Sequence, residues 1–248
     1  MRKITTALLL ASICATSAAD DATNARLGEA MKSPVRSEAD TARDDNRKPV
    51  ETLAFFGLTH DMKVLELLPG SGWYTKLLAP TLAADGELYV AIGVGRVRDN
   101  LLKEPGFDKV RVLDFDPGFD RAGPFNTYNL NEFDFGEDGF DMVLTFRNMH
   151  NLTPAARATV NAAAFKALKS GGVYGVVDHT ARHMEPMTAE NRRRLDPVVV
   201  IKEVTSAGFV FEDYSDLHYR PDDELRYEVG RKSVTGNTDR YTLRFRKP

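Results

Sequence analysis

An α/β fold, in which helices cover both faces of a mostly parallel sheet, is the class that this sequence predicts. Short apolar runs of strand length alternate along the chain with segments of helical periodicity, and glycine or proline separates many of them. The 248 residues suffice for one large domain with a well-buried core. The final two apolar runs lie close together near the end of the chain and predict a terminal antiparallel pair of strands.

Each element can be assigned from its own pattern. A helix over 153–168 is predicted with Thr153 as N-cap and Pro154 in its first turn, and Gly171-Gly172 ends it. Another helix over 73–84 is interrupted or bent by Pro80, and a third covers 196–208. The expected strands are 63–68, 86–93, 109–115, 140–146 and 173–179, followed by 209–215 and 239–247.

The first residues of the chain have the pattern of a secretory signal. Arg2 and Lys3 precede an apolar core at 4–13 that is too short to span a bilayer, and small residues at 17–19 provide a cleavage site. Residues 1–19 are therefore predicted to be a signal peptide, which implies a periplasmic or secreted protein. Residues 20–45 contain few large apolar side chains and are predicted to form a linker, partly helical or disordered, before a folded domain at 46–248.

Composition excludes several classes of function. The single cysteine, Cys14, lies inside the predicted signal, so the mature chain has no disulfide, thiolate nucleophile or cysteine-ligated zinc. Acidic residues, 36 in all, outnumber the 33 basic ones, and no long block of one sign occurs, which argues against a nucleic-acid partner. Since no second apolar span follows the signal, no stable membrane anchor is expected after cleavage. A small-molecule substrate remains as the expected partner.

The stretch "VLELLPGSGWYT" (64–75) joins a predicted strand to a predicted helix through two glycines. Such a turn directs backbone N–H groups and the positive end of the helix toward a ligand above the sheet. Gly70 and Gly72 leave room for that ligand to approach, and Glu66 at the end of the strand can accept hydrogen bonds from an ammonium or hydroxyl group. The turn is predicted to border a ligand crevice.

The order of the motifs resembles that of S-adenosylmethionine-dependent methyltransferases. "VLELLPGSGWYT" is followed by "GFDMVLTFRNMHNLTP" and then by "ALKSGGVYGVVDH", and the wording is similar to a subgroup of predicted bacterial methyltransferases that carry signal peptides. The resemblance covers about residues 47–248 and implies a Rossmann-like, seven-stranded sheet and S-adenosylmethionine as cofactor. It implies these cofactor contacts: Glu66, Gly70 and Gly72 near the methionine part, Arg147, Asn148 and Met149 on the sulfonium side, and Asp114 or Asp116 at the adenine.

The sequence departs from the family pattern at two points. The family normally ends its second strand with an acid that binds the ribose hydroxyls, whereas this chain has Ile92 and Gly93 there, with Glu87 and Asp99 displaced. Leu68 occupies the position of the first glycine of the turn. Because a leucine adopts positive φ only at a cost, the turn is expected either to keep Leu68 in strand geometry or to have a different shape.

The candidate base for methyl transfer is a histidine where the crevice opens. His150 follows the fourth strand, and Asp178 and His179 end the fifth; the alternative is that both histidines make only structural hydrogen bonds. A metal site built from Asp178, His179, His183 and Glu185 is not predicted, because the segment lacks the helical pattern that would make its histidines converge. "NRRRL" (191–195) is interpreted as a solvated face, with an anion clamp over the pocket as the alternative.

Three functions follow in order of preference. The first is methyl transfer from S-adenosylmethionine to a small molecule. The second is an exported, non-catalytic ligand-binding protein that retains the methyltransferase fold, which the departures at Leu68 and Ile92 and the export signal favour. A nicotinamide-dependent dehydrogenase comes last, because the three-glycine fingerprint is missing.

Overall fold

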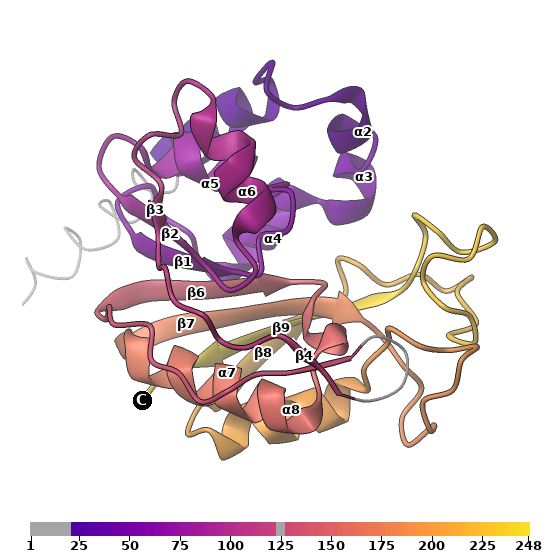
Figure 1. The fold of residues 1–248 in the computed structure, drawn as a ribbon. Coiled ribbons are helices and arrows are strands. Elements are labelled where there is room, and N and C mark those ends of the chain that lie inside the picture. Colours follow the sequence, from indigo (N-terminus) through magenta and orange to yellow (C-terminus); the bar gives the residue numbers. More distant parts are fainter. Residues whose placement is uncertain (1–20, 123–126) are drawn as a thin grey trace, which may run out of the picture.

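The computed structural model describes residues 21–122 and 127–248, so the predicted signal peptide lies outside the described residues. A seven-stranded sheet runs through the centre of the molecule in the order β3-β2-β1-β6-β7-β9-β8 (Figure 1). Its strands are β1 (Lys63–Leu67), β2 (Glu87–Ala91), β3 (Arg111–Val112), β6 (Phe140–Phe146), β7 (Leu168–His179), β8 (Val210–Ser215) and β9 (Arg240–Arg246).

The sheet is mostly parallel, as predicted. β1 pairs in parallel with both β2 and β6, and β6 pairs in parallel with β7. β9 runs antiparallel to both of its neighbours, β7 and β8, which gives the expected terminal antiparallel pair. A separate two-stranded antiparallel ribbon joins β4 (Asp120–Arg121) to β5 (Tyr128–Asn129). The predicted fold class is confirmed.

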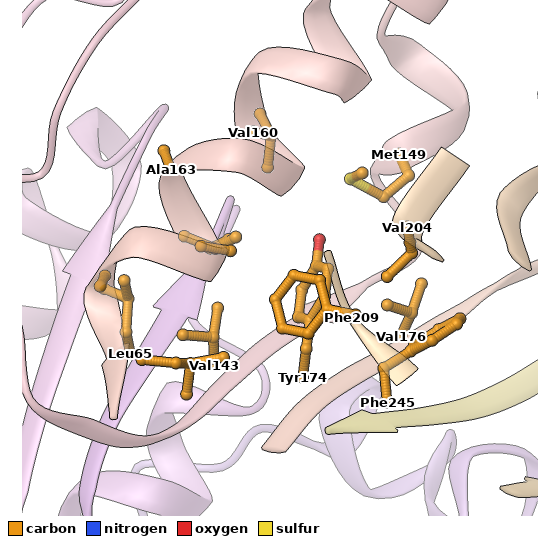
Figure 2. Close-up of a cluster of buried hydrophobic side chains, with 14 of the residues drawn as sticks. Leu65, Val143, Met149, Val160, Ala163, Tyr174, Val176, Val204, Phe209 and Phe245 are labelled. Carbon is orange, nitrogen blue, oxygen red and sulfur yellow. The ribbon is translucent and has the colours of Figure 1, made fainter. Parts of the chain in front are cut away.

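Helices cover both faces of this sheet (Figure 1). α4 (Pro49–Phe56), α5 (Thr75–Leu82) and α6 (Gly95–Asp99) lie on one face, and α7 (Pro154–Ala167) and α8 (Pro197–Ser206) lie on the other. Because successive strand residues point to opposite faces, Val64 packs with the first group of helices and Leu65 with the second. Figure 2 shows the core under α7, where Leu65, Val143 and Tyr174 lie together.

Local sequence explains the helix ends. The side chain of Thr153 accepts a hydrogen bond from the N–H of Ala156 and caps α7, and Pro154 follows as predicted. Pro80 lies inside α5, which continues through it to Leu82. Two strands differ from prediction: β3, an edge strand, is shorter, and β7 begins earlier, at Leu168, with an irregularity in its pairing to β6.

Residues 21–45 pack onto the domain, which corrects the expectation of a linker that buries little surface. They are helical at 21–31, in α2 (Glu38–Thr41) and at the start of α3 (Asp44–Arg47). Leu27 and Ala30 are 1% and 3% exposed and join the core formed by α4 and α5. The composition was misleading because a few apolar side chains suffice when the domain offers a complementary surface. Within the described residues, no helix is both long enough and apolar enough to cross a membrane.

Candidate active site

Three neighbouring strands end in the same unusual backbone conformation. Leu68, Ile92 and Arg147 directly follow β1, β2 and β6, and their φ angles are 54°, 62° and 60°. This left-handed region costs a non-glycine residue roughly 1–2 kcal/mol, and such outliers cluster at functional sites. β1 lies between β2 and β6, so this edge is the switch point of the sheet, where α/β folds bind ligands.

Leu68 takes the conformation that a glycine would have, so the expectation that the turn avoids positive φ was wrong. Its N–H donates to the carbonyl of Ala91 at 2.9 Å, and its carbonyl accepts from Nδ2 of Asn148 at 2.7 Å. Asn148 Nδ2 also donates to the carbonyl of Phe146 at 3.0 Å. These hydrogen bonds tie the ends of β1, β2 and β6 together and offset the conformational cost at Leu68.

A cavity of about 250 Å³, here called the polar cavity, opens between the ends of β1 and β6. Glu66 lines it and is only 2% exposed. Thr75 Oγ1 donates to Oε2 of Glu66 at 2.6 Å. Burial raises the pKa of Glu66 to about 7, against the opposing effects of the Thr75 hydrogen bond and the charge of Arg47. A cationic ligand beside Glu66 would therefore stabilise the ionised carboxylate, because it would replace the hydration lost on burial.

The opposite wall of the polar cavity is cationic and aromatic. Arg47 stacks over Trp73 with its guanidinium carbon 4.3 Å from the ring centroid, and its Nε is buried without a hydrogen-bond partner. Burial, followed by the charge of Arg147, lowers the pKa of Arg47 to about 9. Tyr74 stacks on Phe146 at a centroid distance of 3.6 Å. The residues lining this cavity include Arg43, Arg47, Glu66, Leu68, Gly70, Ser71, Trp73, Tyr74, Arg96, Phe146, Arg147 and Asn148.

A second cavity of about 450 Å³, here called the aromatic cavity, adjoins the first. Leu68 and Asn148 line both cavities, so the turn after β1 separates two compartments of one crevice. The remaining lining residues of the aromatic cavity are Phe119, Tyr128, Asn151, Leu152, Arg192 and Arg193. A larger cavity of about 660 Å³ lies outside the strand edge, between Pro34–Val35 and α6, and shares only Ser71 with this crevice.

The segment "NRRRL" is not the solvated face that the sequence favoured. Asn191 and Arg194 are 7% and 2% exposed, and Arg194 forms a buried ion pair with Asp223 at 2.9 Å. Arg192 and Arg193 line the aromatic cavity, while Arg193 is ion-paired with Glu228. Within this segment, Arg194 therefore belongs to a buried ion pair, whereas Arg192 and Arg193 belong to the wall of the aromatic cavity.

His150 and Asp178, two predicted catalytic residues, form a buried pair. Nδ1 of His150 lies 2.6 Å from Oδ1 of Asp178, and the His150 N–H donates to Oδ2 at 3.0 Å. Asp178 also accepts from the N–H of His179 at 2.8 Å. Since a carboxylate only accepts, the proton of a neutral His150 is on Nδ1 and its Nε2 carries a lone pair. This is the arrangement of a base that a carboxylate orients, but His150 is 5% exposed and lines neither cavity.

His179, the third predicted catalytic residue, uses both of its ring nitrogens within the protein. Arg147 Nε donates to Nε2 of His179 at 3.0 Å, and Nδ1 lies 2.8 Å from Oγ1 of Thr238. Burial, followed by the charge of Arg147, lowers the pKa of His179 well below its usual value. The ring is therefore neutral and orients Arg147, whose terminal NH₂ groups have no hydrogen-bond partner among the described residues.

The predicted glycines have different roles. Gly70 has a φ of 62°, lines the polar cavity, and a Cβ added there meets nothing within 4 Å. Gly72 lies outside both cavities, and a Cβ at this position would come within 2.4 Å of Leu101 Cδ2 and 2.9 Å of Val97 Cγ2. Gly72 thus allows α5 to pack closely against α6 and the following turn. Met149 is also a packing residue, 1% exposed and pointing into the core under α7 (Figure 2).

The predicted adenine contacts do not lie in either cavity. Asp114 is exposed and forms an ion pair with Arg98 at 3.3 Å, and Asp116 accepts from the N–H of Gly118 at 2.9 Å in a tight turn. Neither displaced acid of the second strand reaches its end, because Glu87 begins β2 and Asp99 lies at the end of α6. Within 21–122 and 127–248, no group of three His, Cys, Asp or Glu side chains is placed to hold a metal ion.

Several residues of the crevice were not predicted from the sequence. Arg43 and Arg47 come from the segment before the first strand, where no motif marks them. Phe119 directly precedes β4 of the small ribbon, and Tyr128 is the first residue of β5. The only available signal for the arginines was their position just before α4, the first helix of the predicted domain.

Known structures share this architecture, although no protein-family model matches the chain and no curated protein matches it in sequence. A SAM-dependent methyltransferase from Aquifex aeolicus aligns over 88% of this chain and 97% of its own, with 15% identity and a TM-score of 0.57. The [4+2]-cyclase SpnF aligns over 82% and 80%, with 14% identity and a TM-score of 0.56.

The glycopeptide N-methyltransferase MtfA, in its complex with S-adenosyl-L-methionine, aligns over 83% of this chain and 95% of its own. The identity is 18% and the TM-score 0.52. At such identities the likeness concerns architecture, and SpnF is described as a cyclase on the same architecture. The chain therefore has the fold of the S-adenosylmethionine-dependent methyltransferases.

Proposed function

We propose that this protein transfers a methyl group from S-adenosylmethionine to a small-molecule acceptor. The observation that carries the proposal is the two-compartment crevice at the switch point of the sheet. Its polar cavity holds a carboxyl and guanidinium groups, and its aromatic cavity holds Phe119 and Tyr128, with Leu68 and Asn148 between them. A ligand with a zwitterionic amino-acid end and an aromatic base matches this division.

The chemistry of the polar cavity fits the amino-acid end of the cofactor. Glu66 is buried with a raised pKa and gains a partner in the ammonium group. Arg47, whose Nε is buried without a hydrogen-bond partner, gains one in the carboxylate. In the aromatic cavity, Phe119 and Tyr128 offer ring faces to the adenine, and Asn148 and Asn151 offer amide groups. When bound, the cofactor supplies an electrophilic methyl group on a sulfonium.

The residues of the chain align the two reactants and receive a proton. Displacement at a methyl carbon demands alignment and the exclusion of water more than acid–base chemistry. Where the acceptor arrives protonated, His150 is the candidate base, since Asp178 would stabilise its imidazolium through Nδ1, although His150 is buried and lines neither cavity. His179 takes no part as a base, since both of its ring nitrogens already have partners.

The ribose contacts differ from the family pattern. No carboxylate follows β2, where Ile92 and Gly93 stand. We therefore assign the ribose hydroxyls to amide groups such as that of Asn151, and neutral hydrogen bonds are about half as strong as those to a carboxylate. Weak affinity for the adenosyl part is an expected consequence.

The test is calorimetry of the mature protein with S-adenosylmethionine, S-adenosylhomocysteine and NAD. We expect both adenosyl compounds to bind and NAD not to bind. Gly70→Val should abolish binding, because Gly70 lines the polar cavity and the added side chain would occupy open space there that the ligand needs. Gly106→Val is the matched control, since Gly106 also has positive φ and open space but lies outside both cavities. Absence of adenosyl binding at millimolar concentration would leave a non-catalytic binding protein.

We also propose that the mature protein is periplasmic or secreted. The support is the sequence alone: a basic start, an apolar core at 4–13 and small residues at 17–19. Cell fractionation with mass spectrometry of the N-terminus tests this location. A mature chain beginning near Asp20 outside the cytoplasm is expected, and an uncleaved cytoplasmic protein would refute it.

A further inference from the structure

Buried positive charge gathers at the polar cavity and behind it: Arg47 and Arg147 line the cavity, and Arg240 lies outside its lining. Arg47 and Arg240 are 8% and 5% exposed, and Arg147 lies beside them, partly buried. Burial, followed by repulsion from Arg147, lowers the pKa of Arg47 to about 9 and that of Arg240 to about 10. Burial also lowers the pKa of Arg147, and Arg43 and Arg193 add repulsion there. Nε of Arg47 and Nε of Arg240 are both buried without a hydrogen-bond partner.

The carboxyl groups around this cluster are fewer than the guanidinium groups. Glu66 acts on Arg47, and Asp178 acts on Arg147 and Arg240, but none of the three arginines has a carboxylate within ion-pairing distance in the described parts of the chain. Arg43, by contrast, forms an ion pair with Asp40 at 2.8 Å, which Asp40 shares with Lys76. Even with Glu66 and Asp178 fully ionised, an excess positive charge remains, and buried charges of this kind are costly until a partner arrives.

Two of the arginines are held in place by other side chains. Arg147 is fixed by His179, which leaves its terminal NH₂ groups free. The carbonyl of Arg47 accepts from Nε2 of His218 at 2.9 Å and from Oγ1 of Thr52 at 3.0 Å, which anchors the backbone from which its side chain enters the cavity. Such preorganisation lowers the entropy that a bound anion would otherwise have to offset.

The proposed cofactor, S-adenosylmethionine, does not neutralise the excess positive charge of these arginines. It carries a sulfonium and an ammonium against a single carboxylate, so it brings further positive charge into the crevice. Its carboxylate can serve Arg47, which leaves Arg147 and the neighbouring Arg240 without an anion. We propose that the methyl acceptor carries a carboxylate or phosphate group that binds Arg147, close to Asn148, where the two cavities meet. This inference rests on the proposed function.

A single reporter makes the anion site measurable without turnover. Trp73 is the only tryptophan of the chain, and it packs against the guanidinium of Arg47 in the polar cavity. Titrations with benzoate, phenyl phosphate and inorganic phosphate, at ionic strength held constant with chloride, are followed by Trp73 fluorescence and calorimetry. Benzamide is the neutral control. The carboxylate and phosphate arms identify which anion the site prefers.

We expect benzoate or a phosphate probe to bind together with S-adenosylhomocysteine, and benzamide not to bind. Because the sulfonium adds a positive charge that the thioether lacks, the anion should raise the affinity for S-adenosylmethionine by roughly fivefold or more, and that for S-adenosylhomocysteine by less. By thermodynamic linkage, the factor by which the anion raises the affinity for one adenosyl compound equals the factor by which that compound raises the affinity for the anion.

Substitutions locate the site. Arg147→Gln should lower anion affinity at least tenfold while S-adenosylhomocysteine still binds, with thermal unfolding confirming that the variant is folded. Arg246→Gln is the matched control, since Arg246 lies at the other end of β9 from Arg240 and pairs with Glu212 at 2.7 Å. Anion affinity should not change in that control.

Each contrary outcome has a definite meaning. Absence of anion binding, unchanged binding in Arg147→Gln, or competition between the anions and S-adenosylhomocysteine would overturn the anionic acceptor while the proposed function stands. Competition would mean that the guanidinium groups serve only the cofactor carboxylate. Anion binding without binding of either adenosyl compound would overturn the proposed function, and the acceptor assignment with it.

Discussion

Nε of Arg147 donates a hydrogen bond to Nε2 of His179 at 3.0 Å, so the first residue after β6 is oriented by the last residue of β7. Because of this hydrogen bond, His179, which is buried and lines neither cavity, supports a guanidinium that does line the polar cavity. The hydrogen bond also joins two neighbouring strand ends at the point where Arg147 adopts its left-handed conformation.

His179→Leu should therefore weaken anion binding, because the leucine cannot accept the Arg147 hydrogen bond. We expect a loss of roughly tenfold, equivalent to one hydrogen bond to a charged group. His179→Gln, whose side-chain carbonyl can accept the same hydrogen bond, should restore part of the affinity. Fluorescence titration of Trp73 with benzoate measures both variants. Equal losses in the two variants would show that His179 is needed only for packing.

Glu66 should make stability depend on pH. Its pKa of about 7 in the folded protein exceeds the value of 4.5 of an unperturbed glutamate, so its stabilising contribution is complete below pH 4.5 and is lost as the pH rises through 7. The loss amounts to about 3 kcal/mol at most. Urea unfolding at pH 4.5 and pH 8 should show this dependence in the wild type and not in Glu66→Gln. An identical pH dependence in both proteins would contradict the raised pKa.

The same carboxyl should release a proton when an ammonium group binds beside it. At pH 6, where Glu66 is mostly protonated, calorimetry of S-adenosylmethionine in buffers of different ionisation enthalpy should detect a release approaching one proton. The Glu66→Gln variant should bind S-adenosylmethionine more weakly and should release no proton from residue 66. Binding without proton exchange in the wild type would place the ammonium elsewhere.

Arg47→Met should stabilise the protein while weakening ligand binding. The substitution removes a buried cation with an unpartnered Nε and keeps an apolar chain against Trp73. Replacement of unpaired buried charge by apolar atoms should raise the free energy of unfolding by about 1 kcal/mol or more, as measured in urea. S-adenosylhomocysteine affinity should fall at least tenfold. A destabilised variant would indicate that the charge of Arg47 is neutralised within the protein.

Gly93→Asp should strengthen binding of the adenosyl part by restoring a carboxylate after β2. Gly93 has a φ of 66°, which aspartate tolerates better than most residues, and an added Cβ would meet Leu68 and Phe119 at 3.6 and 3.7 Å, which is ordinary contact. A charged hydrogen bond to the ribose should raise S-adenosylhomocysteine affinity roughly tenfold. Gly93→Asn is the matched neutral control. No gain over the asparagine variant would mean that the ribose lies away from this strand end.

Sequence patterns predicted the elements whose signals are local. The Thr153–Pro154 pair and the strand 140–146 were placed correctly because capping chemistry and apolar runs depend on near neighbours. Glu66, Gly70, Arg147 and Asn148 line one cavity, at the edge where β1 and β6 end, and their contacts to a cofactor remain a prediction. The conformation of Leu68 was missed, because hydrogen bonds from residues far along the chain offset its cost.

The roles of adjacent residues were harder to predict. Neighbouring residues of a strand point to opposite faces, so Asp178 contacts His150 while His179 contacts Arg147, although the two are consecutive in sequence. Arg47 was missed because its role depends on three-dimensional proximity to Trp73 and Glu66. Charge clusters assembled from distant segments leave no periodic signal in a single sequence.

The docking of residues 21–47 determines when the crevice is completed. The carbonyl oxygen of Asp40 accepts from Trp73 Nε1 at 3.0 Å, and its carboxylate pairs with Lys76 of α5 at 2.7 Å. Arg43 and Arg47, on the same segment, line the polar cavity. During synthesis this segment emerges before the helix that receives it. The polar cavity is therefore complete only once residues 21–47 are docked, although this segment is synthesised before the sheet that it covers.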